Sequence, residues 1–175
     1  MRDAILQEIE SVEAADPLEM DHRSDALAWI ASGAPFCRIE KPAVPPKHLV
    51  AYFAVVDADR ILLVDHKNAQ MWLPPGGHVE PNEHPRQTVA REIQEELGFA
   101  SPHRIGAPIM ITCDTTVGLT AGHIDVCLWY LVRASERIRH DEGEFHGVRW
   151  FDFSAIPTER CHPGIRRFVS KLKAD

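Results

Sequence analysis

The segment from residue 77 to residue 99 constrains this chain most, because it predicts both a helix and a cation site. It reads GHVEPNEHPRQTVAREIQEELGF. Glu92, Glu95 and Glu96 stand at positions i, i+3 and i+4, so on a helix their carboxylates project from one face. Adjacent carboxylates repel one another unless a cation lies between them. Such oxygen ligands favour Mg²⁺ or Mn²⁺, which usually arrives with substrate phosphates, so the segment predicts a metal-assisted phosphoryl-transfer site.

The spacing of the same segment resembles the Nudix box. Nine positions match the pattern of that family: Gly77, Glu83, Arg91, Glu92, Ile93, Glu95, Glu96, Gly98 and Phe99. The flanking strand pattern is also similar to the Nudix fold, which extends the resemblance to roughly residues 47–155. The resemblance implies an α/β fold, namely a Nudix-type α/β/α sandwich with a mixed sheet. We expect residues 1–46 to form an N-terminal helical extension packed on the core, and residues 47–175 to form a Nudix hydrolase domain.

The resemblance also implies roles for the carboxylates and for one glycine. In the family, the glutamates that match Glu95 and Glu96 bind metal. The glutamate that matches Glu92 binds metal or serves as the general base, depending on the member. The carbonyl of the glycine that matches Gly76 commonly completes the coordination. The expected cofactor is therefore Mg²⁺ or Mn²⁺, held by these residues.

Many family members place another essential glutamate in the loop before the last core strand. That loop here reads HDEGEFHGVRW. Glu144 is the first candidate, as a further metal ligand or as the general base, and Glu142 is the alternative. An ordinary acidic loop is the competing interpretation, and the choice of base between Glu92, Glu144 and Glu142 stays open.

A salt bridge between Arg91 and Glu83 is a further feature that the resemblance implies. In the family this pair pins the glycine loop to the helix. A partly buried pair costs desolvation, so we expect it to fix the geometry of the catalytic residues rather than to add much stability. Gly77 is expected to allow a backbone conformation that a β-carbon would block. The opposite side of the helix should be core, formed by Val89, Ile93, Leu97 and Phe99.

Three more side chains are candidate substrate contacts. His78 lies inside the box loop and therefore near the predicted metal site. His123 alternates with Asp125 on a predicted strand, so the two share a face that could line a pocket or belong to the core. Trp72, just before the box, could stack on a nucleobase or pack at the end of the sheet.

Apolar periodicity and turn residues outline the remaining elements. Two N-terminal helices, over residues 2–14 and about 25–32, are separated by a break at Asp16-Pro17. The box helix is expected to begin near His84-Pro85 and to stop at Gly98. Strands are expected over residues 48–56, 60–66, 108–115, 123–132 and 147–153, and a closing helix over residues 162–173.

Composition excludes several classes of function. The net charge of −7 argues against bulk nucleic-acid binding, although a divalent cation can still mediate contact with a nucleotide. No apolar run approaches the ~18 residues that span a bilayer, and the N-terminus does not resemble a signal peptide. We therefore expect a cytoplasmic protein without membrane contact. The four cysteines are scattered singly, which predicts reduced thiols rather than disulfides or a zinc motif.

Together these features predict a metal-dependent hydrolase of phosphoanhydride bonds in nucleoside diphosphate derivatives, with (deoxy)nucleoside triphosphates or related nucleotides as substrates. One alternative is a catalytically silent nucleotide-sensing module that regulates a partner. Another is an isoprenoid-diphosphate isomerase, for which Cys113 is the nearest candidate acid. Many family members are dimers, so the extension could also serve a homodimer.

Overall fold

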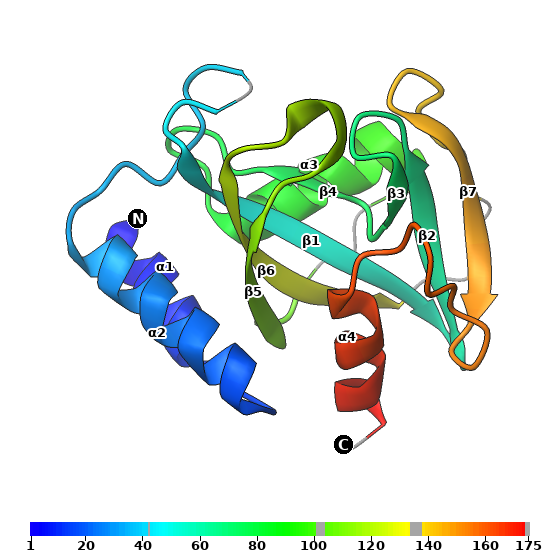
Figure 1. Ribbon diagram of the computed structural model, residues 1–175, viewed down its shortest axis with the longest axis horizontal. Helices are drawn as coiled ribbons and strands as arrows, with labels where there is room; N and C mark the ends of the chain where they lie inside the picture. The colour runs from blue at the N-terminus through cyan, green and yellow to red at the C-terminus, as the bar shows by residue number, and fades with distance from the viewer. Residues whose placement is uncertain (42, 101–103, 134–137, 174–175) are drawn as a thin grey trace.

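The computed structural model describes residues 1–41, 43–100, 104–133 and 138–173. Figure 1 shows the helices and strands of this part of the chain, in the order α1 (Arg2–Glu10), α2 (Pro17–Ala31), β1 (Lys47–Asp57), β2 (Arg60–His66), β3 (Met71–Leu73), β4 (Gly76–His78), α3 (Pro85–Leu97), β5 (Met110–Thr115), the short 3-10 helix η1 (Gly118–Thr120), β6 (Ile124–Arg133), β7 (Phe145–Asp152) and α4 (Gly164–Leu172). No helix in these ranges has the length and the apolar composition needed to cross a membrane.

The strands form one mixed sheet with β1 at its centre. The order along the sheet is β3-β2-β1-β6-β5, while β4 pairs with β1 and β7 pairs with β2. The strands β1 and β6 run parallel, and the other pairs are antiparallel. This arrangement confirms the predicted mixed sheet and leaves the start of β1 between β4 and β6.

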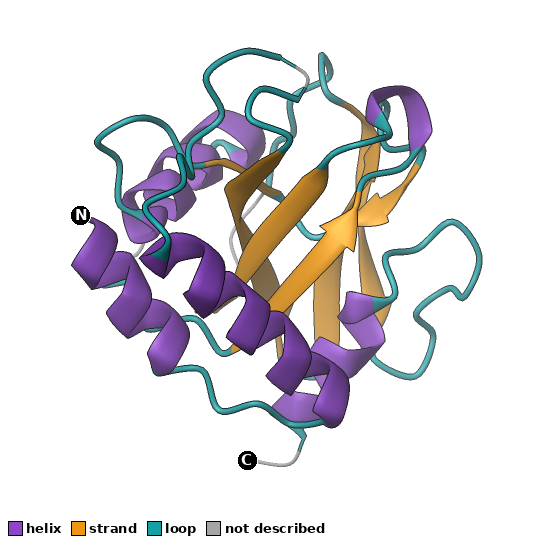
Figure 2. Ribbon diagram, turned by 60° about the vertical axis from the view of Figure 1, so that its left-hand side comes forward, coloured by secondary structure: helices purple, strands orange, loops and turns teal. Residues whose placement is uncertain are grey.

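Apolar cores lie on both faces of the sheet, because successive residues of β1 point to opposite sides. One core combines Leu49, Ala51, Phe53 and Val55 of β1 with buried residues of α1, α2 and α3. The other combines Val50, Tyr52, Ala54 and Val56 of β1 with buried residues of α4. Figure 2 shows the helices around the sheet, and the two cores confirm the predicted α/β fold.

The second helix is longer than the sequence predicted. It begins at Pro17 rather than near residue 25, because Asp16 caps its N-terminus. The Asp16 carboxylate accepts a hydrogen bond from the Glu19 amide at 2.8 Å, and a proline is well tolerated in a first helical turn. The Asp16-Pro17 pair therefore separates the two helices, as expected, but it also starts the second one.

Other boundaries differ by smaller amounts. The first helix ends at Glu10, and β7 begins at Phe145, two residues before the predicted start at 147. The strand β6 begins at Ile124, so His123 lies just before it. The short strands β3 and β4 were not predicted, since a strand of three residues is too short to show a period.

Polar contacts tie the first two helices to the rest of the molecule. Glu8 of α1 pairs with Arg86 of α3, and its other oxygen accepts a hydrogen bond from the Tyr130 hydroxyl at 2.9 Å. Glu19 of α2 is 1% exposed and pairs with Lys171 of α4 at 2.9 Å. These helices thus contribute contacts to both helical layers, while the division of the chain at residues 46 and 47 stays a prediction.

Candidate active site

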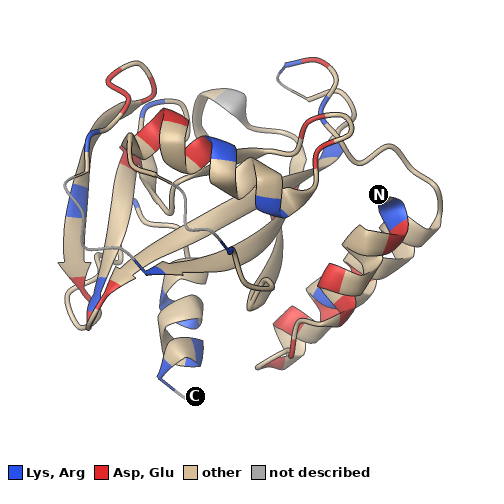
Figure 3. Ribbon diagram, turned by 180° about the vertical axis from the view of Figure 1, so that it is seen from behind, with Lys and Arg blue, Asp and Glu red and all other residues tan. Residues whose placement is uncertain are grey.

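A cleft of about 660 Å³ brings together side chains from distant parts of the chain. It is lined by residues 38–41 before β1, by the start of β1, by β4 and by the C-terminal half of α3. Residues of β2 and β3 with the turn between them, residues after β5, the turn before β7 and the segment before α4 also line it. Figure 3 shows the acidic bands on the C-terminal half of α3.

Four of the glutamates that line this cleft are the ones that the sequence predicted as metal ligands. Three come from α3, namely Glu92, Glu95 and Glu96, and the fourth, Glu144, comes from the turn before β7. Their environments differ, since the Glu95 side chain is 59% exposed whereas Glu96 is 4% exposed. Glu142, the alternative to Glu144, is not among the cleft-lining residues of the described chain.

The ionised forms of the two more buried glutamates, Glu92 and Glu96, are disfavoured by their surroundings. Burial raises the pKa of Glu92, and the charges of Glu95 and Glu144 add to this shift, although Arg91 opposes it. Burial also raises the pKa of Glu96 well above its usual range, and the charge of Glu92 adds to it. Both carboxylates therefore favour a nearby positive charge. The donor set of four carboxylates in one cleft fits a hard divalent cation such as Mg²⁺ or Mn²⁺.

Arg91 holds the glycine loop against α3. Its Nε donates to Glu83 at 3.0 Å, and its Nη2 donates to the His78 carbonyl at 3.3 Å. Its Nη1 donates to Glu92 at 2.7 Å. Burial opposes the ionisation of Glu83, but hydrogen bonds from Arg91 and Thr88 outweigh it and lower the pKa of this carboxyl. The salt bridge expected from the resemblance is thus present, and one guanidinium orients both the loop and a cleft carboxylate.

Two glycines let the loop approach its neighbours closely. Gly76 has φ +150°, and a β-carbon there would lie 2.3 Å from the carbonyl oxygen of Ala51. The Gly76 amide donates to the Glu96 carboxylate at 2.9 Å. At Gly77 a β-carbon would lie 1.7 Å from Oε1 of Glu92. The predicted reason for Gly77 was therefore wrong: the special conformation belongs to Gly76, and Gly77 makes room for the Glu92 side chain.

The sequence candidates for substrate contact divide into two groups. His78 and His123 both line the cleft. Trp72 is not among the cleft-lining residues of the described chain, and its ring lies edge-on against Phe151 with centroids 5.1 Å apart. Trp72 thus packs against the core cluster that includes Phe151, and its contact with a nucleobase stays a prediction.

Sequence reasoning missed two basic residues, Arg38 and Lys41, that line the cleft from the segment before β1. Arg38 Nη1 lies 3.1 Å from Nε2 of His78. Burial lowers the pKa of Arg38, and the charges of Asp125, Glu144 and Glu92 partly offset this effect. No local sequence pattern marks these residues, because the path of the folded chain between α2 and β1 brings them to the cleft.

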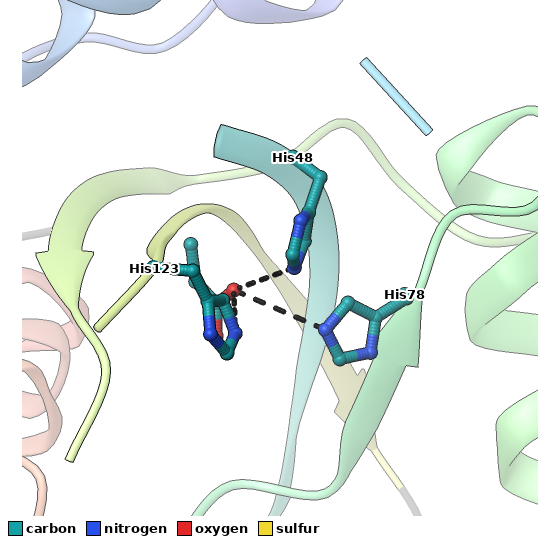
Figure 4. A group of neighbouring side chains, drawn as sticks. His48, His78 and His123 are labelled. Carbon is teal, nitrogen blue, oxygen red and sulfur yellow. Dashed lines mark ion pairs between the residues drawn. The ribbon is translucent and has the colours of Figure 1, made fainter. Parts of the chain in front are cut away.

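Three histidines and an aspartate form a cluster, of which His78, His123 and Asp125 line the cleft while His48 lies buried behind them. Figure 4 shows the three histidine rings close together. The pairing of β1 with β6 sets His48 opposite Asp125, and the pairing of β1 with β4 sets Val50 opposite His78. His48 and Val50 share a face of β1, as do His123 and Asp125 of the neighbouring segment. Burial lowers the pKa of His78 to about 2, and the charge of Arg38 adds to this effect. The sequence suggested that His123 and Asp125 share a face, but not that His48 joins them.

Cys113 lies apart from these groups. Its thiol donates to the His22 carbonyl at 3.5 Å, and it is not among the described residues that line the cleft. Burial raises the pKa of this thiol to about 12, and the charge of Asp25 adds to the shift. This placement gives no support to the isomerase alternative.

Comparison with known proteins points to one family. A family model of the NUDIX domain matches residues 46–172, which is more than half of the chain. Among solved structures, a MutT NUDIX hydrolase from Burkholderia pseudomallei has a TM-score of 0.62 and 27% sequence identity, over 72% of this chain and 98% of that chain.

Two curated relatives match shorter stretches. A Bacillus subtilis protein, named as a candidate 8-oxo-dGTP diphosphatase, is 42% identical over 43 residues, or 25% of this chain and 29% of that protein. The asymmetrical bis(5'-nucleosyl)-tetraphosphatase of Rattus norvegicus is 34% identical over 59 residues, or 34% of this chain and 40% of that protein. The matched part of the chain thus spans less than half the length of either relative.

Proposed function

Because the chain belongs to the Nudix family and is of the MutT type, we propose that it is a metal-dependent pyrophosphohydrolase. Its proposed substrates are nucleoside diphosphate derivatives, with (deoxy)nucleoside triphosphates first. The observation that carries this proposal is the single cleft that Glu92, Glu95, Glu96 and Glu144 line together. The names of the two curated relatives support nucleotide phosphoanhydrides as the substrate class, although they refer to different nucleotides.

Phosphoanhydrides react slowly with water because their negative oxygens repel the attacking nucleophile. A bound Mg²⁺ or Mn²⁺ would neutralise that charge and help to hold the water in line. We assign its ligands to Glu92, Glu95, Glu96 and Glu144, with the Gly76 carbonyl as a further oxygen. The raised pKa values of Glu92 and Glu96 are consistent with this role, since both carboxylates lack full compensation for their charge.

The remaining cleft residues position these groups and the substrate. Arg91, paired with Glu83, fixes the side chain of Glu92 relative to the glycine loop. Arg38 and Lys41, which line the same cleft, supply positive charge for phosphate oxygens. The general base is Glu92 or Glu144, because either carboxylate could take a proton from the attacking water.

The experiment that tests this proposal is a phosphate-release screen with Mg²⁺. It would offer canonical and oxidised (deoxy)nucleoside triphosphates, nucleotide sugars, ADP-ribose and dinucleoside polyphosphates, with added phosphatases to reveal products other than free phosphate. The Glu95→Gln/Glu96→Gln variant serves as the blank, and Glu159→Gln, at an exposed site outside the cleft, is the matched control. We expect turnover of one nucleotide class by the natural protein and by Glu159→Gln but not by the blank.

A folded protein that binds nucleotide and metal but turns over no member of the panel would contradict the proposal. That result would favour the nucleotide-sensing alternative. Turnover by the blank at the natural rate would instead show that the α3 carboxylates are not the catalytic groups.

A further inference from the structure

The group formed by His48, His78, His123 and Asp125 is chemically different from the carboxylates of α3. It offers three imidazoles and one carboxylate, whereas the α3 site offers oxygen atoms alone. One potential ligand atom from each of the four residues lies within 4.8 Å of the others. Figure 4 shows the three rings arranged around the carboxylate oxygen.

The spacing of these atoms is close to that of a tetrahedral metal site. Oδ1 of Asp125 lies 3.2 Å from Nε2 of His48, 3.4 Å from Nε2 of His123 and 3.9 Å from Nε2 of His78. Ligands bound to zinc at about 2.0–2.1 Å with tetrahedral angles are separated by about 3.3 Å. Two of these separations already match that value, and a rotation of the side chains that shortens the longer ones would bring the four atoms to bonding distance of one ion.

The hydrogen bonds of His48 leave its Nε2 with a lone pair that points at another acceptor. Nδ1 of His48 lies 2.8 Å from the Pro45 carbonyl, which can only accept, so Nδ1 carries the proton of the neutral ring. Nε2 of His48 and Oδ1 of Asp125 then face each other as two acceptors. The side chain of His48 is 0% exposed, and neither atom has a hydrogen-bond partner within the described chain. A buried pair of this kind needs a cation or a proton between its atoms.

The surrounding groups orient the rings as the outer shell of a metal site does. His123 Nδ1 lies 3.1 Å from the Thr116 hydroxyl, and that hydroxyl lies 3.2 Å from the His123 carbonyl. The hydroxyl can thus donate to the carbonyl and accept from Nδ1–H, which directs Nε2 of His123 towards Asp125. A ligating imidazole typically donates its other N–H to a carbonyl or a polar oxygen, as His48 and His123 can do here.

We propose that His48, His78, His123 and Asp125 form a second metal site, which binds a borderline divalent ion of the Zn²⁺ type. Three imidazole nitrogens and a carboxylate oxygen suit Zn²⁺ and similar transition ions, whereas Mg²⁺ prefers oxygen ligands throughout. The site shares no ligand with the α3 carboxylates, so its occupancy can be measured apart from the proposed hydrolysis. A bound ion would link the starts of β1 and β6 to β4, and so brace the glycine loop.

Among the arginines and lysines of the described chain, Arg38 already contacts this group, through Nε2 of His78. Zinc binding requires its guanidinium to swing away from that ring. The negative charges of Glu144 and Glu92 attract the guanidinium of Arg38 towards these carboxylates, and they raise its pKa. The two clusters in the cleft therefore compete for Arg38, and metal binding at the histidines would release it towards the acidic side.

The test is zinc stoichiometry after chelator treatment, equilibrium dialysis with Zn²⁺ and elemental analysis. We expect one zinc per chain in the natural protein and also in the Glu95→Gln/Glu96→Gln variant, which separates this site from the catalytic one. Asp125→Asn and His78→Gln should each lose the zinc, and His146→Gln, at an exposed position of β7, should keep it. Circular dichroism checks the fold of each variant, and His78→Gln is the safer substitution because its side chain is 26% exposed.

Two further readouts distinguish a built site from loose association. Co²⁺ in place of Zn²⁺ should give the intense visible bands of a four-coordinate ion rather than the weak bands of an octahedral one. Zinc at about 100 times its Kd should raise the Tm of the natural protein by about 5–10 °C and leave that of His78→Gln unchanged. A natural protein that retains no zinc, or folded Asp125→Asn and His78→Gln variants that retain it fully, would overturn the proposal.

Discussion

Replacement of Gly77 by alanine should separate catalytic geometry from stability. The added β-carbon would lie 1.7 Å from Oε1 and 2.4 Å from Cδ of Glu92, so the two side chains cannot keep their positions. The Glu92 side chain is flexible and can rotate away, which limits the damage to the fold. The rotation breaks the 2.7 Å hydrogen bond from Arg91, and we expect a loss of about 1–2 kcal/mol in the free energy of unfolding.

The effect on activity should be much larger. Glu92 is a proposed ligand or base, and a displacement of about 1 Å in a catalytic group can cost about 100-fold in rate. We therefore expect kcat/KM of Gly77→Ala to fall about 100-fold, measured by phosphate release with the best substrate of the screen. Urea unfolding of the same preparation would report its stability.

A second glycine provides the matched control for this substitution. A β-carbon at Gly106 would meet no atom within 4 Å, so Gly106→Ala should keep both activity and stability. Activity of Gly77→Ala within about threefold of the natural protein would refute the reasoning, because it would mean that the position of Glu92 does not matter. Loss of activity together with global unfolding would refute the claim that a flexible side chain absorbs the clash.

Three further predictions concern other parts of the molecule. Glu144→Gln should reduce kcat by at least about tenfold while Glu142→Gln should not, in the same phosphate-release assay, because only the former residue lines the cleft; equal losses would contradict this. Asp16→Ala should remove the cap of α2 and lower stability by about 1 kcal/mol, seen as a Tm lower by about 2–4 °C with activity retained; an unchanged Tm would show that the cap is dispensable. Glu83 has a folded-state pKa below its ordinary value of 4.5, so its contribution to stability is fully present above that pH and is lost as the pH falls through the lower folded-state value. Between pH 5 and pH 3 the natural protein should therefore lose more stability to urea than Glu83→Gln, and parallel losses would argue against a stabilising Arg91 pair.

Elements with a strong local period were predictable from sequence. The box helix, the strands β1 and β2 and the closing helix each carry enough apolar residues in register to show their type. The start of α2 was not predictable in the same way, because Asp-Pro reads equally as a helix break and as a cap followed by a first turn. The hydrogen bond from the Glu19 amide to the Asp16 carboxylate, together with the burial of Glu19, decides for the cap.

The acidic half of the cleft was predictable because its three main residues lie within one turn of one helix. The histidine group was not, since it depends on the register of β1 with two other strands. His48 lies opposite Asp125 only because β1 and β6 pair in parallel, and a shift of one residue would turn His48 to the other face. Sequence spacing carries no information on that register, so the position of His48 beside Asp125 could not be predicted.

The segment between α2 and β1 changes how the N-terminal extension should be viewed. It brings Arg38 and Lys41 into the cleft. Both precede the region that the family model matches, and within the described chain they are the lysine and arginine side chains that line the cleft from outside that region. Glu8 and Glu19 hold α1 and α2 in place through contacts with α3, β6 and α4. Arg38 contacts His78 of the histidine group and interacts electrostatically with Glu144 and Glu92. The extension therefore supplies a positive charge that acts on both clusters.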